Sequence, residues 1–254
     1  FNGEESIKSD INVFALGGGS WKVTGSDGIW LKTFAKKKIK TVPFVAANCA
    51  FDVRWPEEFV QKNQGEAFKN ITISCDGAVQ KGEVVVTEFG LEGNAIYALT
   101  PQIQKQLSNG RNATIEIDLK KQLDEVSVFN KLNSSSLNTT SVLKKTIRLS
   151  AVQIDLLRYM LTKEEFTNHK ILAHKIKNFP LTITGSAPID EAISTTGGIP
   201  LASLTSNFEL KELPGNYCIG EMVDWNAPTG GYLIQGCASM GVYLAGKLNE
   251  QIIK

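Results

Sequence analysis

Residues 220–241 constrain the fold more than any other part of the sequence; they read GEMVDWNAPTGGYLIQGCASMG. An apolar run at residues 217–220 predicts a strand, and a Pro-Thr-Gly-Gly turn after Asp224 leads into a helix predicted over residues 231–253. The first turn of a helix exposes backbone N–H groups that suit an anionic or electron-rich ligand. A carboxylate only accepts hydrogen bonds, so Asp224 suits a ribose or ribityl hydroxyl. The segment therefore predicts an α/β fold with a ligand at this turn. The alternative is a small-residue helix packed closely on a sheet without a ligand.

A second glycine-rich segment follows the first predicted strand. Residues 11–16 form a short apolar run, typical of a buried parallel strand, that ends in Gly17-Gly18-Gly19. Such glycines let the backbone approach a ligand closely, although a plain turn explains them as well. The segment is not a G-x-G-x-x-G phosphate loop, because Lys22 stands where the third glycine belongs. A helix over residues 29–35 and an extended segment over residues 41–47, with Pro43 favouring a sheet edge or a bend, are predicted next.

The middle of the sequence differs in character from both ends. Two β-rich runs, at residues 71–75 and 83–87, flank the hairpin signal Asp76-Gly77, and residues 114–119 alternate apolar and polar side chains. Predicted helices cover residues 121–132, 151–160 and 163–177, and strand character returns at residues 179–184. We therefore expect a first α/β part over residues 1–64, an inserted β-rich and helical domain over residues 65–181, and a second α/β part over residues 182–254.

Composition narrows the class of protein. The net charge of +1 gives no argument for nucleic acid or an anionic membrane as a partner, and no apolar run approaches the roughly 18 residues of a membrane span. Four cysteines without a Cys-x-x-Cys pair, and only two histidines, do not support a metal site. We expect a cytoplasmic protein with no metal, free buried thiols and an unknown oligomeric state. No secretory signal is visible. Because the sequence starts at Phe1 and not at Met, and residues 1–10 resemble the end of a preceding segment, we expect a fragment: a processed chain, a truncated chain or the C-terminal portion of a larger protein.

Four motifs then occur in one order along residues 13–246: ALGGGSWKVTGSDG, GEVVVTEFGLEGNAI, EAISTTGGIPL and PGNYCIGEMVDWNAPTGGYLIQGCASMGVYLAG. Together they resemble the BaiN-like NAD(P)/FAD-dependent oxidoreductases, an uncharacterised bacterial branch of flavoproteins in the glutathione-reductase-type superfamily. Leu16 replaces the threonine usual in that family, and Glu92-Gly93 stands where serine or glycine is common. The first phosphate-binding unit of the family, with its G-x-G-x-x-G loop, has no counterpart in the sequence.

The resemblance implies a fold and a set of site residues. The fold is a partial FAD/NAD(P)-binding Rossmann-like α/β domain, interrupted by an insert domain made of a β-barrel plus helices. The implied FAD-binding residues fall into four groups. Gly17 and Gly18 lie at the phosphate–ribityl region, and Gly197 and Gly198 line the approach to the isoalloxazine ring. Gly220, Glu221 and Asp224 meet the ribityl and pyrophosphate groups, and the helix start beneath the flavin consists of Thr229, Gly230, Gly231 and Tyr232.

The implied function is that of an FAD-dependent oxidoreductase with an unknown small-molecule substrate. NAD(P)H is the candidate electron donor, and no catalytic proton donor stands out in the sequence. The missing phosphate loop keeps an alternative open, namely a non-catalytic binding module or interaction domain on a flavoprotein scaffold that no longer holds FAD.

Overall fold

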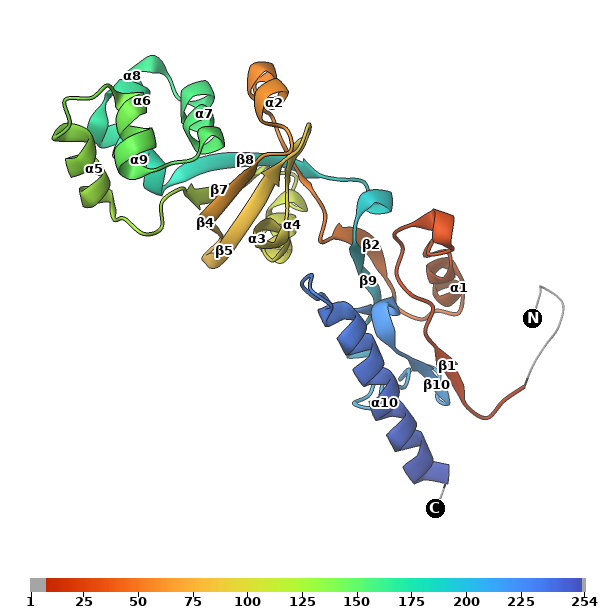
Figure 1. The fold of residues 1–254 in the computed structure, drawn as a ribbon. Helices are drawn as coiled ribbons and strands as arrows, with labels where there is room; N and C mark the ends of the chain where they lie inside the picture. The colour runs from red at the N-terminus through yellow and green to blue at the C-terminus, as the bar shows by residue number, and fades with distance from the viewer. Residues whose placement is uncertain (1–7, 253–254) are drawn as a thin grey trace. The chain divides into compact units, whose positions relative to one another are not determined.

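The computed structural model describes residues 8–252 and divides into two compact units (Figure 1). Unit 1 comprises the described residues up to Asn48 together with those from Pro188 onward, and unit 2 comprises residues 49–187. The part boundaries predicted from the sequence, at 64/65 and 181/182, both fall inside unit 2. The strand and helix between residues 49 and 64, and the end of the last barrel strand, belong to that unit.

Unit 1 contains two small sheets and two α-helices. Strands β1 (Asn12–Phe14) and β10 (Asn216–Cys218) form a parallel pair in which Phe14 lies opposite Cys218. A three-stranded sheet has the order β11 (Val223–Asp224), β9 (Ser194–Pro200) and β2 (Val42–Ala47). The α-helices are α1 (Trp30–Lys36) and α10 (Tyr232–Ile252), and 3-10 turns cover Lys22–Thr24, Ile189–Glu191, Leu201–Ser203 and Gly220–Met222.

The parallel pairing predicted for the first strand is confirmed, and so is the edge position of the Pro43 strand, since β2 pairs only with β9 in its sheet. The partial Rossmann-like domain stays a prediction, because the parallel strands of the described part form pairs and not one extended sheet.

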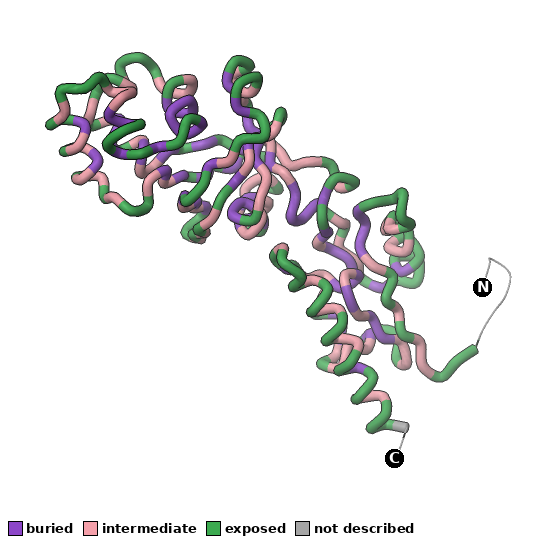
Figure 2. Tube along the Cα trace, viewed as in Figure 1, coloured by how far each residue is buried: buried purple, intermediate pink, exposed green. Residues whose placement is uncertain are grey.

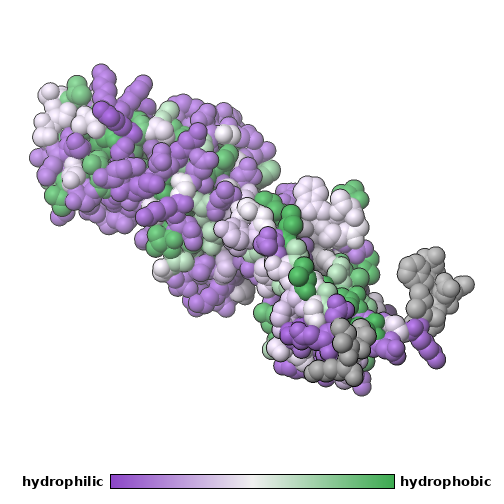
Figure 3. Space-filling model, turned by 60° about the horizontal axis from the view of Figure 1, so that its bottom comes forward, coloured by the Kyte–Doolittle hydropathy of each residue, from purple (hydrophilic) through white to green (hydrophobic). Residues whose placement is uncertain are grey.

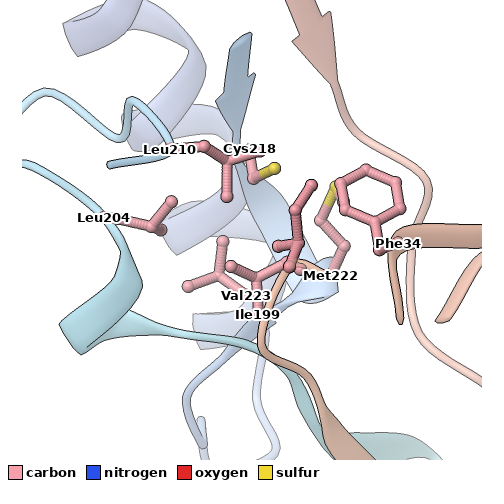
Figure 4. Packing of buried hydrophobic residues seen from close by; sticks show 8 residues of the cluster. Phe34, Ile199, Leu204, Leu210, Cys218, Met222 and Val223 are labelled. Atoms are coloured by element: carbon pink, nitrogen blue, oxygen red, sulfur yellow. The ribbon is translucent and has the colours of Figure 1, made fainter. Parts of the chain in front are cut away.

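The core of unit 1 lies between α1 and the strands. It consists of Phe34, Ile39, Ile199, Leu204, Leu210, Cys218, Met222 and Val223, and Figure 4 shows Met222 reaching toward the ring of Phe34. Burying such apolar side chains stabilises a fold by about 1.5–3 kcal/mol each. This cluster holds the ends of β9, β10 and β11 together, which positions the loops that follow them.

Unit 2 is built around a closed barrel. Its strands follow the order β3 (Phe51–Val53), β6 (Gly90–Glu92), β5 (Ala78–Val86), β4 (Ala67–Cys75), β7 (Ala113–Asp118) and β8 (Phe179–Ser186). The predicted hairpin is confirmed: Asp76 and Gly77 both have positive φ, as a two-residue turn of this type requires, and Cys75 pairs with Ala78. The alternation along β7 is confirmed as well, because its apolar side chains are buried in the barrel (Figure 2).

The helices of unit 2 are α2 (Glu57–Asn63), α3 (Asn94–Tyr97), α4 (Thr100–Leu107), α5 (Glu125–Asn133), α6 (Thr139–Ser141), the π-helix η2 (Val142–Ile147), α7 (Ala151–Met160), α8 (Lys163–Thr167) and α9 (His169–Lys177). The helix predicted over residues 151–160 is confirmed, and Ser150 and Gln153 cap its start. The single helix predicted over residues 163–177 is wrong, because Asn168 ends α8 and caps α9 with its side chain. None of the helices in the described part combines the length and apolar character needed to cross a lipid bilayer.

Candidate functional site

Two glycine turns meet at one edge of the parallel pair in unit 1. Because β1 and β10 run in the same direction, the residues that follow them leave at the same edge. The N–H of Ile219 donates to the carbonyl of Phe14 at 3.0 Å and fixes the two exits side by side. Gly17 and Gly220 each have a positive φ at these exits, +74° and +81°, which glycine adopts at no steric cost. The structure therefore brings together two of the predicted glycine segments.

A glycine–carboxylate cluster forms where these exits meet β9. The N–H of Gly19 donates to Thr195 Oγ1 at 3.1 Å, and the N–H of Thr195 donates to Glu221 Oε1 at 3.0 Å. A Cβ atom at Gly18 would overlap Thr195 Oγ1 and would lie 2.7 Å from the Glu221 carboxyl carbon. Gly18 and Glu221 thus lie together, and the side chains of Thr195 and Glu221 leave no space for a side chain at position 18.

Asp224 supports the glycine pair of β9. Its Oδ1 accepts a hydrogen bond from the N–H of Gly197 at 3.0 Å. Gly197 and Gly198 have φ values of +104° and +103°, and a Cβ at Gly198 would overlap the carbonyl oxygen of Met222. One oxygen of the Asp224 carboxylate therefore supports the backbone of β9. The second oxygen can accept a hydrogen bond from a ligand hydroxyl.

A pocket of about 290 Å³ lies at the start of α10, and its walls come from Asn48, Ile193, Ser194, Pro228, Thr229, Gly230, Gly231, Leu233 and Ile234. Gly230 and Gly231 have φ values of +102° and +89°, and a Cβ at Gly231 would meet no atom within 4 Å. The turn thus requires glycine for its backbone conformation and leaves open space beside it. α10 begins at Tyr232, which is 62% exposed. The FAD-binding role implied for Thr229, which lines the pocket, stays a prediction.

Asn48 is the site residue that the sequence reasoning missed. Its side chain is buried, and its Nδ2 donates to Ser194 Oγ at 2.7 Å and to the carbonyl of Ala227 at 2.8 Å. These bonds tie the end of β2 to β9 and to the loop before α10, so Asn48 fixes one wall of the pocket. The available signal was a lone amide in the apolar run VPFVAANCAF. Ser194 lines the pocket and its neighbour Thr195 belongs to the glycine–carboxylate cluster, so β9 connects the two.

The small residues of α10 have one clear packing role. A Cβ at Gly236 would overlap the ring of Trp225, whose Nε1 donates to the carbonyl of Gly220 at 3.0 Å. A Cβ at Gly246 would meet nothing within 4 Å. Close packing therefore explains Gly236 and does not explain Gly246.

Thiol chemistry gives no nucleophile at this site. All four cysteines are free, as predicted, and burial raises the pKa of Cys218 to about 12. Burial and, secondarily, the charge of Glu221 raise the pKa of Cys237, the thiol nearest the glycine–carboxylate cluster. Since the thiolate is the reactive form, neither cysteine is activated at neutral pH. Among residues 8–252, no three His, Cys, Asp or Glu side chains gather in a way that could hold a metal ion.

The residues present fit one end of a flavin dinucleotide. A volume of about 290 Å³ is at the lower limit of ligand pockets, which span roughly 300–1,000 Å³. The helix start and its two glycines suit a flat, electron-rich group, and the carboxylates of Glu221 and Asp224 suit hydroxyls. Ser194 of the pocket and Thr195, which bonds to Glu221, are neighbours on β9, so this strand joins the pocket to the carboxylates.

Two comparisons with known proteins bear on this site. The model of one family, described as "HI0933-like protein barrel and H2TH domain", matches residues 45–194, more than half of the chain. The chain is also 25% identical over 227 residues to a ribosomal RNA dihydrouridine synthase of Escherichia coli (strain K12), a match that covers 88% of the chain and 56% of the relative. The chain thus spans about half the length of this curated relative.

Proposed function

Because the chain belongs to the HI0933-like family, which is associated with FAD and oxidoreductase chemistry, we propose that unit 1 binds the ribityl–isoalloxazine end of FAD. The observation that carries the proposal is the pocket at the start of α10, with Gly230 and Gly231 in its wall. The backbone there is open to a ligand, and the helix N-terminus favours electron-rich atoms. Because the family is associated with FAD, membership favours an FAD-dependent oxidoreductase over a binding module that no longer holds the cofactor.

Each part of the site has its own task in this proposal. Asp224 accepts a ribityl hydroxyl while its Oδ1 keeps the β9 glycines in place through Gly197. Asn48 holds the pocket wall, and Ile193 and Ile234 supply apolar surface that excludes water. The bound flavin supplies the two-electron chemistry, which the protein only positions and tunes. NAD(P)H is the proposed electron donor.

The relative suggests a substrate. That protein is a ribosomal RNA dihydrouridine synthase, and dihydrouridine is uridine with two hydrogens added across the C5–C6 double bond of uracil. As a second candidate function, we propose that the present chain reduces uridine in ribosomal RNA to dihydrouridine. The balanced reaction consumes one NAD(P)H and one proton for each uridine reduced. The sequence itself provides no argument for a nucleic-acid partner, so this candidate rests on the relative alone.

FAD binding tests the proposal directly. We would titrate the chain into FAD, follow flavin fluorescence, and compare two matched variants. Ile193→Trp fills the pocket from a position that is 56% exposed, and Ile29→Trp adds the same ring in unit 1 at a residue that is 59% exposed and outside the pocket. The proposal predicts that Ile193→Trp weakens binding at least tenfold, or about 1.4 kcal/mol, and that Ile29→Trp binds like the wild type. Equal affinities in all three proteins would contradict it.

A further inference from the structure

The helical part of unit 2 is the basic region of an otherwise nearly neutral chain. Residues 119–178 contain eleven Lys and Arg against five Asp and Glu, while the whole chain has 27 against 26. No acidic residue lies between Glu125 and Asp155, a stretch that includes Lys144, Lys145 and Arg148. Figure 3 shows hydrophilic side chains over the end of unit 2 formed by these helices. The charge is therefore gathered in one part of the fold.

The π-helix η2 presents part of this charge outward. Its apolar residues Leu143 and Ile147 are buried, whereas Lys144 and Lys145 are exposed in its last turn. Arg148 follows directly in the left-handed conformation, with φ +61° and ψ +50°, and is also exposed. Single π-turns and left-handed non-glycine residues are uncommon and occur often at functional sites. Three cationic side chains therefore project from one short, unusually shaped segment.

Lys120 extends the same surface from the end of β7. Its Nζ donates to the carbonyl of Arg148 at 3.2 Å, so the two residues are held together although both are positively charged. Burial, and then the charge of Arg148, lower the pKa of Lys120, which is the direction expected when like charges approach. A bound anion would relieve this repulsion. The adjoining start of α7, capped by Ser150, adds the positive end of a helix.

Most acidic groups of the region already have partners. Lys177 pairs with Asp118, Lys62 with Asp155, and His174 with Glu125, while Asp124 caps α5. Among the described residues, no carboxylate forms an ion pair with Lys121, Lys144, Lys145 or Arg148. We refer to these four residues together with Lys120 as the η2 basic surface.

We propose that the η2 basic surface binds the phosphate backbone of RNA. The choice of RNA rests on the second candidate function above, whereas the affinity for a polyphosphate rests on the geometry alone. The guanidinium of Arg148 can hold one phosphate through two parallel hydrogen bonds, and the lysines add point charges along the strand. Such contacts give affinity and register without reading sequence.

Fluorescence anisotropy of a fluorescein-labelled RNA hairpin of about 20 nucleotides, with uridines in its loop, tests the proposal. The triple variant Lys144→Gln/Lys145→Gln/Arg148→Gln keeps the aliphatic stems and removes three charges. Its matched control, Lys36→Gln/Lys37→Gln/Lys40→Gln, removes three exposed charges from unit 1. We expect the first variant to bind about tenfold or more weakly at about 100 mM salt, and its log–log salt slope to fall by roughly 2, since each single-strand phosphate contact contributes about 0.7. The control should bind like the wild type.

Several outcomes would overturn the inference. Equal losses in both triple variants would indicate unspecific attraction to net charge. No RNA binding by the wild-type chain, combined with η2-dependent binding to phosphatidylglycerol vesicles, would assign the surface to a membrane. Circular dichroism of both variants checks that they are folded. FAD titration of the same proteins separates the two proposals: RNA binding without FAD binding would refute only the flavin site, and FAD binding without RNA binding would refute only the η2 basic surface.

Discussion

Thirteen of the seventeen exposed large apolar side chains of the described residues lie in unit 1, whereas the phenylalanines that are 0% exposed, Phe51, Phe59 and Phe68, all lie in unit 2. The difference follows from topology. The six strands of unit 2 close into a barrel that leaves no edge, while β1 pairs only with β10 and α10 buries little more than Leu244 (Figure 2). On α10, Ile234 and Val242 are 77% and 76% exposed.

This contrast separates a unit with a well-buried core from one that exposes many large apolar side chains. Exposed apolar side chains that gather on one face mark surfaces that bind a ligand or further polypeptide. Figure 3 shows such hydrophobic side chains on the visible face of unit 1. The candidate flavin site lies in this unit, so we expect a bound cofactor to stabilise unit 1, and unit 2 to be stable without it.

The largest effect is expected in the core of the barrel. Phe68 is fully buried in β4, whereas Phe89, also in unit 2, is 71% exposed. Phe68→Ala should lower the free energy of unfolding of unit 2 by about 3–5 kcal/mol through the lost burial and the cavity. Phe89→Ala should change it by less than about 0.5 kcal/mol. Urea unfolding followed by hydrogen exchange in β4 and β5 measures both, and similar values for the two variants would refute the closed-core description.

The next effect concerns the flavin. Asp224→Asn keeps an oxygen for the N–H of Gly197 but removes the charge, so FAD should bind more weakly by about 1.5–3 kcal/mol, the worth of a hydrogen bond to a charged group. Asp76→Asn, at the hairpin of unit 2, makes the same chemical change and should leave FAD affinity unaltered. Flavin fluorescence quenching reports both values. An unchanged affinity in Asp224→Asn would remove this residue from the proposed site.

Two glycines of α10 test its one-sided packing. Gly236→Ala places a methyl group against the ring of Trp225, which costs about 1–3 kcal/mol and outweighs the helix propensity gained, about 1 kcal/mol. Gly246→Ala meets open space and should stabilise the helix by roughly 0.5–1 kcal/mol. Thermal unfolding of α10, followed by hydrogen exchange, should therefore shift in opposite directions. Shifts of the same sign would show that the ring of Trp225 does not pack closely against α10 at Gly236.

The smallest expected effect is a difference between the two units in how readily they unfold locally. Cys218 in unit 1 is 0% exposed and Cys75 in unit 2 is 3% exposed, and burial raises the pKa of both thiols, so neither reacts readily in the folded state. In mild urea at constant pH, iodoacetamide should nevertheless label Cys218 first, because unit 1 opens more easily. Mass spectrometry of peptides gives the two rates. Earlier labelling of Cys75 would show that unit 2 opens more easily than unit 1 and would contradict the prediction.

The sequence predicted local elements well where a single signal dominated. The hairpin at Asp76-Gly77 and the capped helix α7 needed only neighbouring residues, and the structure has both. The split at Asn168 was missed, because a capping side chain in a helical pattern was read as part of the helix. Strand β9 was not predicted as a strand, since its Gly197-Gly198 pair resembles a turn in isolation.

The site was predictable only in part for a related reason. The glycines after β1 and β10 were identified because a turn that needs positive φ selects glycine. Their meeting with Thr195, and the role of Asn48, depend on contacts between residues more than 140 positions apart. Single-sequence patterns carry no information about such contacts, so those residues emerged only from the fold.

Discrimination between the two ends of FAD tests the central claim most directly. Riboflavin, which contains the isoalloxazine and ribityl groups, and AMP, which contains the adenosine end, would each be titrated into the 254-residue chain by calorimetry. The account predicts that riboflavin binds, that Ile193→Trp abolishes this binding, and that AMP gives no signal. Binding of AMP without binding of riboflavin would contradict the assignment of the α10 pocket to the flavin.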